Sequence, residues 1–274
     1  MKIELARHYG FCFGVKRAIN IAQNSKNAST IGPLIHNNEE ISRLKRDFNV
    51  ETLEDISQAK NLKKAIIRTH GITKENLKFL KEKEVDIIDA TCPFVTKPQQ
   101  ICETMSAKGY DIVIFGDKNH PEVKGVKSYA STKVYVVLSV DELKDKFLSN
   151  KIAVVAQTTR KIDEFAEITN YLIKNYKEVR VFNTICNATF DNQDAAKELA
   201  KKSDVMIVIG GKNSSNTKQL HSIAKEFCSD SYLIESENEL ESEWFRDKKI
   251  CGVTAGASTP DWIIEKVIGK IKKI

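Results

Sequence analysis

The chain has 274 residues, of which 41% are hydrophobic and 29% charged, and its 43 Lys and Arg against 37 Asp and Glu give a formal net charge of +6. This composition is typical of a folded, water-soluble protein, and no apolar run approaches the roughly 20 residues that span a bilayer. The opening segment MKIELARHYG lacks the regions of a signal peptide, so we expect a cytoplasmic protein without a membrane segment.

Positive charge is spread along helix-like segments. The chain lacks the arginine-rich stripe with stacking aromatic residues that is typical of nucleic-acid binding, so we expect no nucleic-acid partner. A modest positive net charge favours an anionic substrate or an acidic protein partner.

Short apolar runs rich in Val and Ile alternate with amphipathic stretches. In chain order, strands are predicted for VDIID, DIVIFG, VYVVL, IAVVAQ, VRVFN, DVMIVIGG and KKICGVTAG. Helices are predicted over residues 15–26, 73–83, 94–108, 161–176, 191–203, 217–228 and 260–273. The alternation indicates an α/β fold with parallel sheets, and unbroken apolar runs suit strands that are covered on both faces.

One arrangement occurs three times: a strand, a short exit, a cysteine and a helix-like run. It is found at KIELARHYGFCFGV, VDIIDATCPFV and VRVFNTICNAT, and its cysteines are Cys12, Cys92 and Cys186. We therefore predict three similar small α/β lobes, over residues 13–91, 92–185 and 186–274, with residues 1–12 completing the third lobe. With residues 1–12 completing the third lobe, the three lobes would form a closed ring.

Cysteines at strand ends are candidates for function, because ligands of open α/β sheets bind outside the carboxyl ends of the strands. The closely spaced Cys or His pairs of a structural zinc site are missing. A [4Fe–4S] cluster held by three thiolates would leave one iron open as a Lewis acid and electron source. Alternatively, each cysteine is a small buried hydrophobe beside a turn. We expect that alternative for Cys102 and Cys228, in helix-like runs, and for Cys251, in a strand.

Polar side chains follow the other strands, at GPLIHN, IIRTHG, FGDKNHPEVKG, VAQTTR, IGGKNSSNT and TAGASTPDW. Three of the five histidines lie at these exits. Several exits precede helices, whose unpaired N–H groups and dipole favour anions, so they predict a cradle for phosphate or diphosphate. The alternative is helix capping alone, by Asn216 or Thr217 for one helix and by Ser258 or Thr259 for another.

Within this polar set we single out the carboxylate of Glu122. Beside a metal-bound hydroxyl it could supply protons, provided that burial keeps its pKa high enough near neutral pH. Alternatively, it complements the dipole of a helix that begins after Pro121.

The motifs YGFCFGV, GPLIHN, RTHG, DATCP, NHPEVKG, QTT, TICNAT, GGKNSSN and GAST resemble those of the 4-hydroxy-3-methylbut-2-enyl diphosphate reductase family, in the family's order from Cys12 to Asp261. The resemblance implies three lobes in a pseudo-threefold α/β arrangement around a central [4Fe–4S] cluster. It implies reductive dehydroxylation of the substrate to isopentenyl and dimethylallyl diphosphate, with two electrons from a ferredoxin or flavodoxin. We expect a monomer.

The resemblance also assigns roles to residues. The three repeated cysteines would hold the cluster, and its open iron would take the substrate hydroxyl. Glu122 matches the proton-relay glutamate, Thr158 matches the threonine near the substrate hydroxyl, and His120 is assigned to both catalysis and diphosphate binding. The groups that align with the diphosphate site are His36, His70, His120, Ser214, Ser215, Asn216 and Ser258.

One position departs from the family pattern. After TICNAT an arginine and a glutamine are expected, whereas this chain has Asn192 and Gln193, which puts in doubt any contact made by that guanidinium. Two other functions stay open. One is a redox-neutral hydro-lyase built on a cluster with an open iron, and the other is a non-enzymatic iron–sulfur or oxygen-sensing module whose polar exits merely cap helices.

Overall fold

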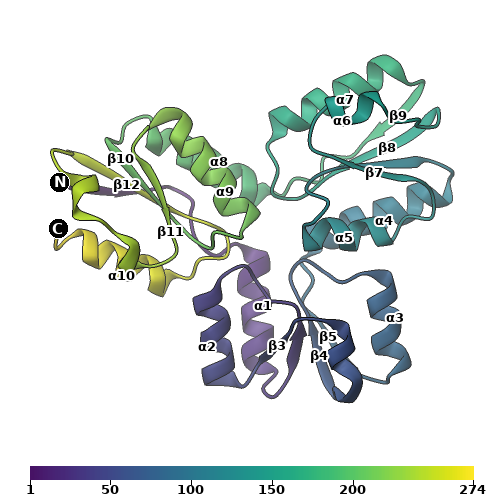
Figure 1. Cartoon of the computed structure of the whole chain (residues 1–274), viewed down its shortest axis with the longest axis horizontal. Helices are drawn as coiled ribbons and strands as arrows, with labels where there is room; N and C mark the ends of the chain where they lie inside the picture. Colours follow the sequence, from purple (N-terminus) through teal and green to yellow (C-terminus); the bar gives the residue numbers. More distant parts are fainter. The chain divides into compact units, whose positions relative to one another are not determined.

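The computed structural model describes residues 1–274 except for the side chains of residues 60 and 61. It contains three four-stranded parallel sheets, each with helices on both faces (Figure 1). The predicted α/β fold in three lobes is therefore confirmed. Among the described residues, no helix is both long and apolar enough to cross a membrane.

The three sheets share one strand order in space: counted within each sheet, the second strand lies at one edge, followed by the first, third and fourth. The first sheet contains β2 (Ser29–Ile31), β3 (Glu51–Leu53), β4 (Lys64–Ile67) and β5 (Asp86–Asp89). The second sheet contains β6 (Asp111–Phe115), β7 (Val134–Val137), β8 (Lys151–Ala156) and β9 (Glu178–Val181). The third sheet contains β10 (Val205–Ile209), β11 (Ser231–Ile234), β12 (Ile250–Ala255) and β1 (Lys2–Leu5).

The first strand of the chain is thus the fourth strand of the third sheet. Lys2 lies opposite Ile250, and Leu5 lies opposite Val253. This pairing is the connection that the repeated cysteine units predict for the first dozen residues. The lobe boundaries near residues 12, 91 and 185 stay a prediction.

The chain divides into two compact units. The first comprises Met1–Lys16, Ile35–Ser42 and Asn187–Ile274 and contains the third sheet, whereas the second comprises Arg17–Leu34 and Arg43–Cys186 and contains the other two. In the second unit, α4 (Pro93–Ala107) follows β5 of the first sheet but packs against β6 and β8 of the second. This packing explains why two sheets share one unit.

All seven predicted helices are present. Besides α4, they are α1 (Phe13–Asn24), α3 (Lys74–Glu82), α7 (Ile162–Asn175), α8 (Asn187–Ala200), α9 (Ser215–Phe227) and α10 (Asp261–Ile271). The helix predicted over 191–203 begins at Asn187. The prediction missed its first turn because that turn is polar and lacks a hydrophobic period. The structure adds α2 (Asn38–Phe48), α5 (Pro121–Ser128), α6 (Asp141–Lys144) and three short 3₁₀ segments, η1 (Ile56–Asn61), η2 (Glu237–Glu239) and η3 (Ser242–Phe245).

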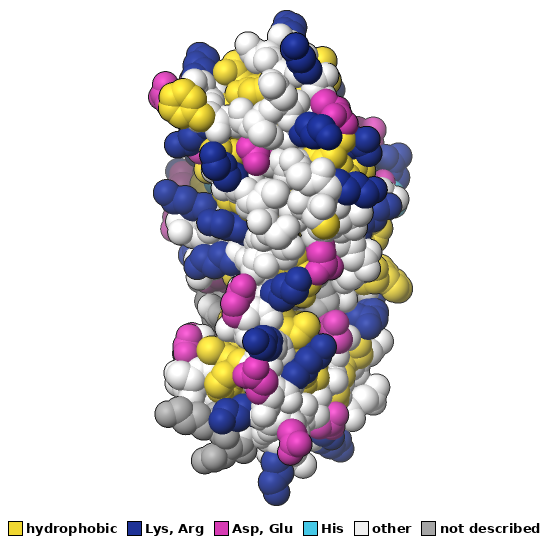
Figure 2. Space-filling view, turned by 90° about the vertical axis from the view of Figure 1, so that its right-hand side faces the viewer, with side chains coloured by type: hydrophobic (Ala, Val, Ile, Leu, Met, Phe, Trp, Pro, Cys, Tyr) yellow, Lys and Arg dark blue, Asp and Glu magenta, His cyan; other side chains and the backbone are white. Residues whose placement is uncertain are grey.

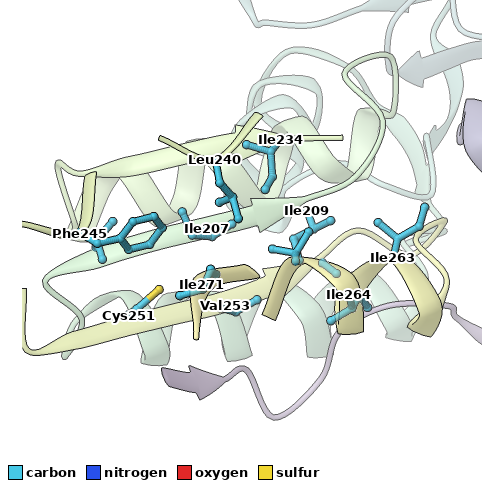
Figure 3. Close-up of a cluster of buried hydrophobic side chains, with 13 residues drawn as sticks. Ile207, Ile209, Ile234, Leu240, Phe245, Cys251, Val253, Ile263, Ile264 and Ile271 are labelled. Carbon is cyan, nitrogen blue, oxygen red and sulfur yellow. The ribbon is translucent and has the colours of Figure 1, made fainter. Parts of the chain in front are cut away.

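The central strands are buried on both faces, as their unbroken apolar sequences predict. In the third sheet, Ile207 and Ile209 of β10 point into one core with Val253, Ile263 and helix α10 (Figure 3). The alternate residues Met206 and Val208 pack on the opposite face, against α8 and α9. The hydrophobic clusters on the two faces hold the strands in place, and with them the polar segments that follow the strand ends.

The surface carries mixed charge. On the face shown in Figure 2, Lys and Arg side chains are interspersed with Asp and Glu, and hydrophobic atoms occur in small groups. No block of like charge covers that face, in agreement with the charge pattern of the sequence.

Candidate active site

The shared strand order separates two kinds of exit. Each repeated cysteine follows the fourth strand of a sheet: Cys92 follows β5, Cys186 follows β9 and Cys12 follows β1. The polar motifs follow the first and third strands, which are neighbours at the centre of each sheet. From the first strand the chain crosses to one edge of the sheet, and from the third strand it crosses to the other edge. Ligands of open α/β sheets bind at such a switch point.

The three cysteine turns have the same backbone contact. The N–H of Cys92 donates to the carbonyl of Thr69 at 3.0 Å, that of Cys186 to Thr158 at 3.0 Å, and that of Cys12 to Ala257 at 3.2 Å. Each acceptor lies in the polar exit of the neighbouring third strand. All three side chains are half-buried and outside any disulfide, so the repeat seen in the sequence is also a repeat of local geometry.

The other three cysteines are buried, as the structural alternative expects. Burial raises the pKa of Cys102 to about 12 and that of Cys251 to about 12, and it also raises the pKa of the Cys228 thiol. Metal binding requires the thiolate, so these environments disfavour it. Cys228 lies just past the end of α9 and not within the helix.

Glu122 lies in the second unit within the first turn of α5, as the dipole alternative expects, but its side chain is only 1% exposed. The N–H of Thr158 donates to its Oε1 at 2.7 Å, and the Thr158 hydroxyl bonds its Oε2 at 2.7 Å. Burial raises the pKa of Glu122 to about 7, while the two bonds from Thr158 act in the opposite direction. The carboxyl can therefore hold or release a proton near neutral pH.

Two histidines accompany this carboxyl. His120 caps α5, and its Nδ1 accepts the N–H of Glu122 at 3.2 Å. The His70 ring meets the His120 ring edge-on, with centroids 5.3 Å apart. The second unit thus brings together four predicted site residues, His70, His120, Glu122 and Thr158.

The first unit brings together another group. The Ser258 hydroxyl donates to the carbonyl of His36 at 3.2 Å, and a Cβ at Gly211 would collide with the same carbonyl. The loop after β10 therefore packs directly on the backbone at His36. This contact requires glycine, which explains one of the two glycines in GGKNSSN.

Asn216 is the most unusual residue of this loop. Its side chain is 4% exposed, and neither its carboxamide oxygen nor its nitrogen has a hydrogen-bond partner among the described residues. A buried amide without partners costs about 1–3 kcal/mol of stability. Such a group is expected where a polar ligand completes the site.

Both capping predictions were wrong. Ser214, and neither Asn216 nor Thr217, caps α9, because its hydroxyl accepts the N–H of Thr217 at 3.3 Å. Helix α10 follows Pro260 without a side-chain cap, and the Thr259 hydroxyl donates instead to the carbonyl of Ile209 at 3.0 Å. Capping alone therefore does not explain the side chains of Asn216 or Ser258.

Asn192, which stands where the resemblance predicts arginine, is buried on α8. It lines a cavity of about 230 Å³ in the first unit together with Cys12, Ala188, Asp191 and residues 7–11. The departure seen in the sequence thus lies beside one of the repeated cysteines.

Two residues with a role at these exits were missed by the sequence analysis. Arg17 of α1 donates to the carbonyls of Thr91 and Asp89, both at 3.2 Å, and so holds the turn before Cys92. Gln157 bonds the loop after β6, where it accepts the N–H of Asp117 at 3.0 Å. The signal for Gln157 was its place inside the QTT motif, whereas Arg17 lies in an ordinary amphipathic helix.

Comparison with known proteins decides the family. A family model described as LytB protein matches residues 3–272. The chain belongs to the LytB family. Among its LytB relatives, 4-hydroxy-3-methylbut-2-enyl diphosphate reductase from Campylobacter concisus is 68% identical over 100% of both chains. The protein of the same name from Campylobacter jejuni strain 81-176 is 71% identical over 99% of this chain and 98% of its own.

Solved structures of similar proteins agree with this family assignment. A structure of (E)-4-hydroxy-3-methyl-but-2-enyl diphosphate reductase, the terminal enzyme of the non-mevalonate pathway, is 42% identical and covers all of both chains with a TM-score of 0.72. The E-1-hydroxy-2-methyl-but-2-enyl-4-diphosphate reductase from Plasmodium falciparum is 27% identical, with a TM-score of 0.92 over 97% of this chain and 86% of its own. The resemblance read from the sequence is confirmed at the level of the LytB family.

Proposed function

We propose that this LytB protein is a 4-hydroxy-3-methylbut-2-enyl diphosphate reductase. It would replace the C–OH bond of its substrate by a C–H bond, taking up two electrons and two protons and releasing one water molecule, to give isopentenyl and dimethylallyl diphosphate. The observation that carries the proposal is the buried Glu122 carboxyl with a pKa of about 7, bonded twice to Thr158. Loss of hydroxide as water requires a proton donor of this kind.

The three repeated cysteines fit an iron–sulfur cluster. They are the half-buried ones among the six, and they share one turn geometry, whereas the other three are held in cores where the thiol is favoured. We assign Cys12, Cys92 and Cys186 as ligands of a [4Fe–4S] cluster with one open iron. When bound, such a cluster supplies single electrons and a Lewis-acid site.

The diphosphate is assigned to the polar exits of the first and third strands. Support comes from the buried, unpartnered amide of Asn216 and from the N-terminus of α9, where Ser214 and Ser215 open the helix. His36, His70, His120 and Ser258 complete the proposed set. Because its Nδ1 accepts the N–H of Glu122, a neutral His120 carries its proton on Nε2 and can donate it to a ligand oxygen.

Within this site the residues of the chain bind and deliver protons. Thr158 holds the Glu122 carboxyl in one orientation, because its N–H donates to Oε1 and its hydroxyl donates to Oε2. Burial excludes water from the carboxyl, so a proton that Glu122 carries is passed to a bound substrate oxygen and not to solvent. We further propose that a ferredoxin or flavodoxin supplies the electrons and that the protein acts as a cytoplasmic monomer. A positive net charge favours acidic partners of that kind.

The test is an anaerobic assay of the purified protein with 4-hydroxy-3-methylbut-2-enyl diphosphate and reduced methyl viologen. We expect both isomeric diphosphate products and dependence on reductant. Turnover without reductant would indicate the hydro-lyase instead, and a cluster whose EPR signal does not respond to the diphosphate would favour the non-enzymatic module.

The cluster assignment has a separate test. Cys92→Ser is expected to lower iron content and to change the EPR spectrum, whereas Cys102→Ala, which removes a core thiol of the same helix region, is expected to keep both. A complete and active cluster in Cys92→Ser would refute the assignment.

A further inference from the structure

Residues Asp117–Glu122 comprise most of the loop that joins β6 to α5 and the first two residues of α5, and they are held at both ends by two adjacent residues just after β8. At its beginning, the carboxamide oxygen of Gln157 accepts the N–H of Asp117 at 3.0 Å. At its end, the N–H and hydroxyl of Thr158 bond the two oxygens of Glu122, both at 2.7 Å. A short segment fixed at both ends by two adjacent residues that directly follow a buried strand has little freedom to shift.

Gln157 itself has a single orientation. It is 2% exposed, its backbone N–H donates to the carbonyl of Phe115 at 2.8 Å, and its Nε2 donates to the Thr159 hydroxyl at 3.2 Å. A flipped amide would turn Nε2, which can only donate, toward the N–H of Asp117. The backbone at Gly116 leaves no spare room, because a Cβ there would lie 2.9 Å from the Gln157 Cβ and 3.0 Å from its Oε1.

The bond made by Gln157 continues along the loop to the imidazole. The Asp117 carbonyl accepts the N–H of His120 at 3.0 Å, and the Asp117 carboxylate accepts the N–H of Asn119 at 2.8 Å. Nδ1 of His120 then accepts the N–H of Glu122 at 3.2 Å. Gln157 and Thr158 are therefore the two ends of one chain of hydrogen bonds that passes through His120 and Glu122.

We propose that Gln157 is a positioning residue: its amide oxygen, acting through Asp117, fixes the ring orientation and tautomer of His120 relative to the Glu122 carboxyl. The proposal rests on the reductase function proposed above for its catalytic consequence. The geometric part stands apart from that function, because none of the bonds involves a substrate or a cofactor.

The test uses three variants of the full chain. Gln157→Met keeps the length of the side chain but removes the acceptor for the Asp117 N–H. Gln157→Glu keeps an acceptor oxygen in both protonation states, so it is the conservative variant expected to rescue. Thr159→Val removes the hydroxyl that accepts from Nε2 and leaves the acceptor oxygen of Gln157 in place.

The first two measurements need no turnover. In Gln157→Met, amide hydrogen exchange across residues 117–122 is expected to rise about tenfold, because a bond that closes the loop is lost. Nitrogen NMR shifts of His120 are expected to change from one tautomer to a mixture. Gln157→Glu and Thr159→Val are expected to keep the wild-type exchange and tautomer. Wild-type exchange and tautomer in Gln157→Met would overturn the proposal, whatever its activity.

The third measurement is steady-state kinetics. Gln157→Met is expected to lower kcat about tenfold with a smaller change in KM, since the loop carries the proton donor as well as a ligand contact, and Gln157→Glu is expected to restore kcat. An equal loss in both variants would overturn the positioning role. If the wild type shows no reductase activity, the proposed function fails, while exchange and tautomer still decide the geometry. If Gln157→Met does not fold, Gln157→Leu, which also lacks the acceptor, takes its place: raised exchange and mixed tautomers support the proposal, and wild-type values refute it.

Discussion

Glu122 and Thr158 lie 36 residues apart in the chain and are joined by two hydrogen bonds of 2.7 Å, one to each carboxyl oxygen. One of the donors is a backbone N–H, which no side-chain substitution removes. The other is a hydroxyl that can donate to a carboxylate or accept from a carboxylic acid. The pair therefore accommodates both protonation states of Glu122 without moving.

The first prediction concerns the pH dependence of stability. The pKa of Glu122 is about 7 in the folded chain against 4.5 without the fold. Between these values the folded state holds a proton that the unfolded state has lost, so the free energy of unfolding falls as pH rises from 4.5 to 7 and is level above. The loss is on the order of 3 kcal/mol.

Glu122→Gln is expected to abolish this loss, because the amide reproduces the protonated acid: its oxygen accepts the Thr158 N–H and its nitrogen donates to the hydroxyl. Denaturant unfolding across the pH range measures the effect. Glu75→Gln, an exposed change on α3, is the control that should keep the wild-type pH dependence. An identical slope in wild type and Glu122→Gln would contradict the assigned pKa.

The second prediction separates the two bonds to Glu122. The Thr158 hydroxyl lowers the pKa of that carboxyl, so Thr158→Val is expected to raise it further, while Thr158→Ser keeps it near the wild-type value. Carbon NMR of the labelled carboxyl follows the titration directly. A pKa in Thr158→Val equal to or below that of the wild type would show that the hydroxyl does not stabilise the charged form.

The third prediction is a conflict between stability and binding at Asn216. Replacement by leucine removes two buried polar atoms without partners and is expected to stabilise the chain by about 1–3 kcal/mol. The same change is expected to weaken diphosphate affinity about 10- to 100-fold, since bonds to a charged ligand are lost.

Asn37 provides the matched control for Asn216. It is equally buried, at 4% exposure, but its oxygen accepts the N–H of Glu40 at 3.0 Å. Asn37→Leu is therefore expected to destabilise. Thermal unfolding and calorimetric titration with inorganic diphosphate measure the two quantities, and a less stable Asn216→Leu would argue against an unsatisfied amide.

The fourth prediction concerns the glycine after His70. Gly71 has φ +73°, and a Cβ there would lie 2.7 Å from Nε2 of the buried Gln99. Gly109 has φ +79° with nothing within 4 Å. Gly109→Ala should cost about 1–2 kcal/mol for the backbone alone, and Gly71→Ala should cost about 1–3 kcal/mol more for the displaced amide. Equal decreases in the free energy of unfolding of the two variants, measured by denaturant unfolding, would mean that the Gln99 side chain moves aside without cost.

The sequence was sufficient for the parallel sheets, the pairing of β1 with the third sheet and the strand-end positions of Cys12, Cys92 and Cys186, because each depends on local pattern and spacing. It was insufficient for α2, whose charged surface obscures its few apolar residues, and for α5, which is only eight residues long. The Gln157 contact with Asp117 joins segments 40 residues apart. Its existence depends on the alignment of β6 with β8, in which Phe115 lies opposite Ala156, and no local pattern encodes that register.

The edge position of β1 has a consequence for how the polypeptide matures. Lys2–Leu5 is synthesised before every other strand of its sheet, and its neighbour Ile250–Ala255 is the last of those strands to be made. The segment Lys2–Leu5 therefore has no hydrogen-bonded strand neighbour until β12 has been synthesised. Completion of the third sheet is accordingly a late folding event, and the hydrogen bond from the Cys12 N–H to the carbonyl of Ala257, which follows β12, can form only then.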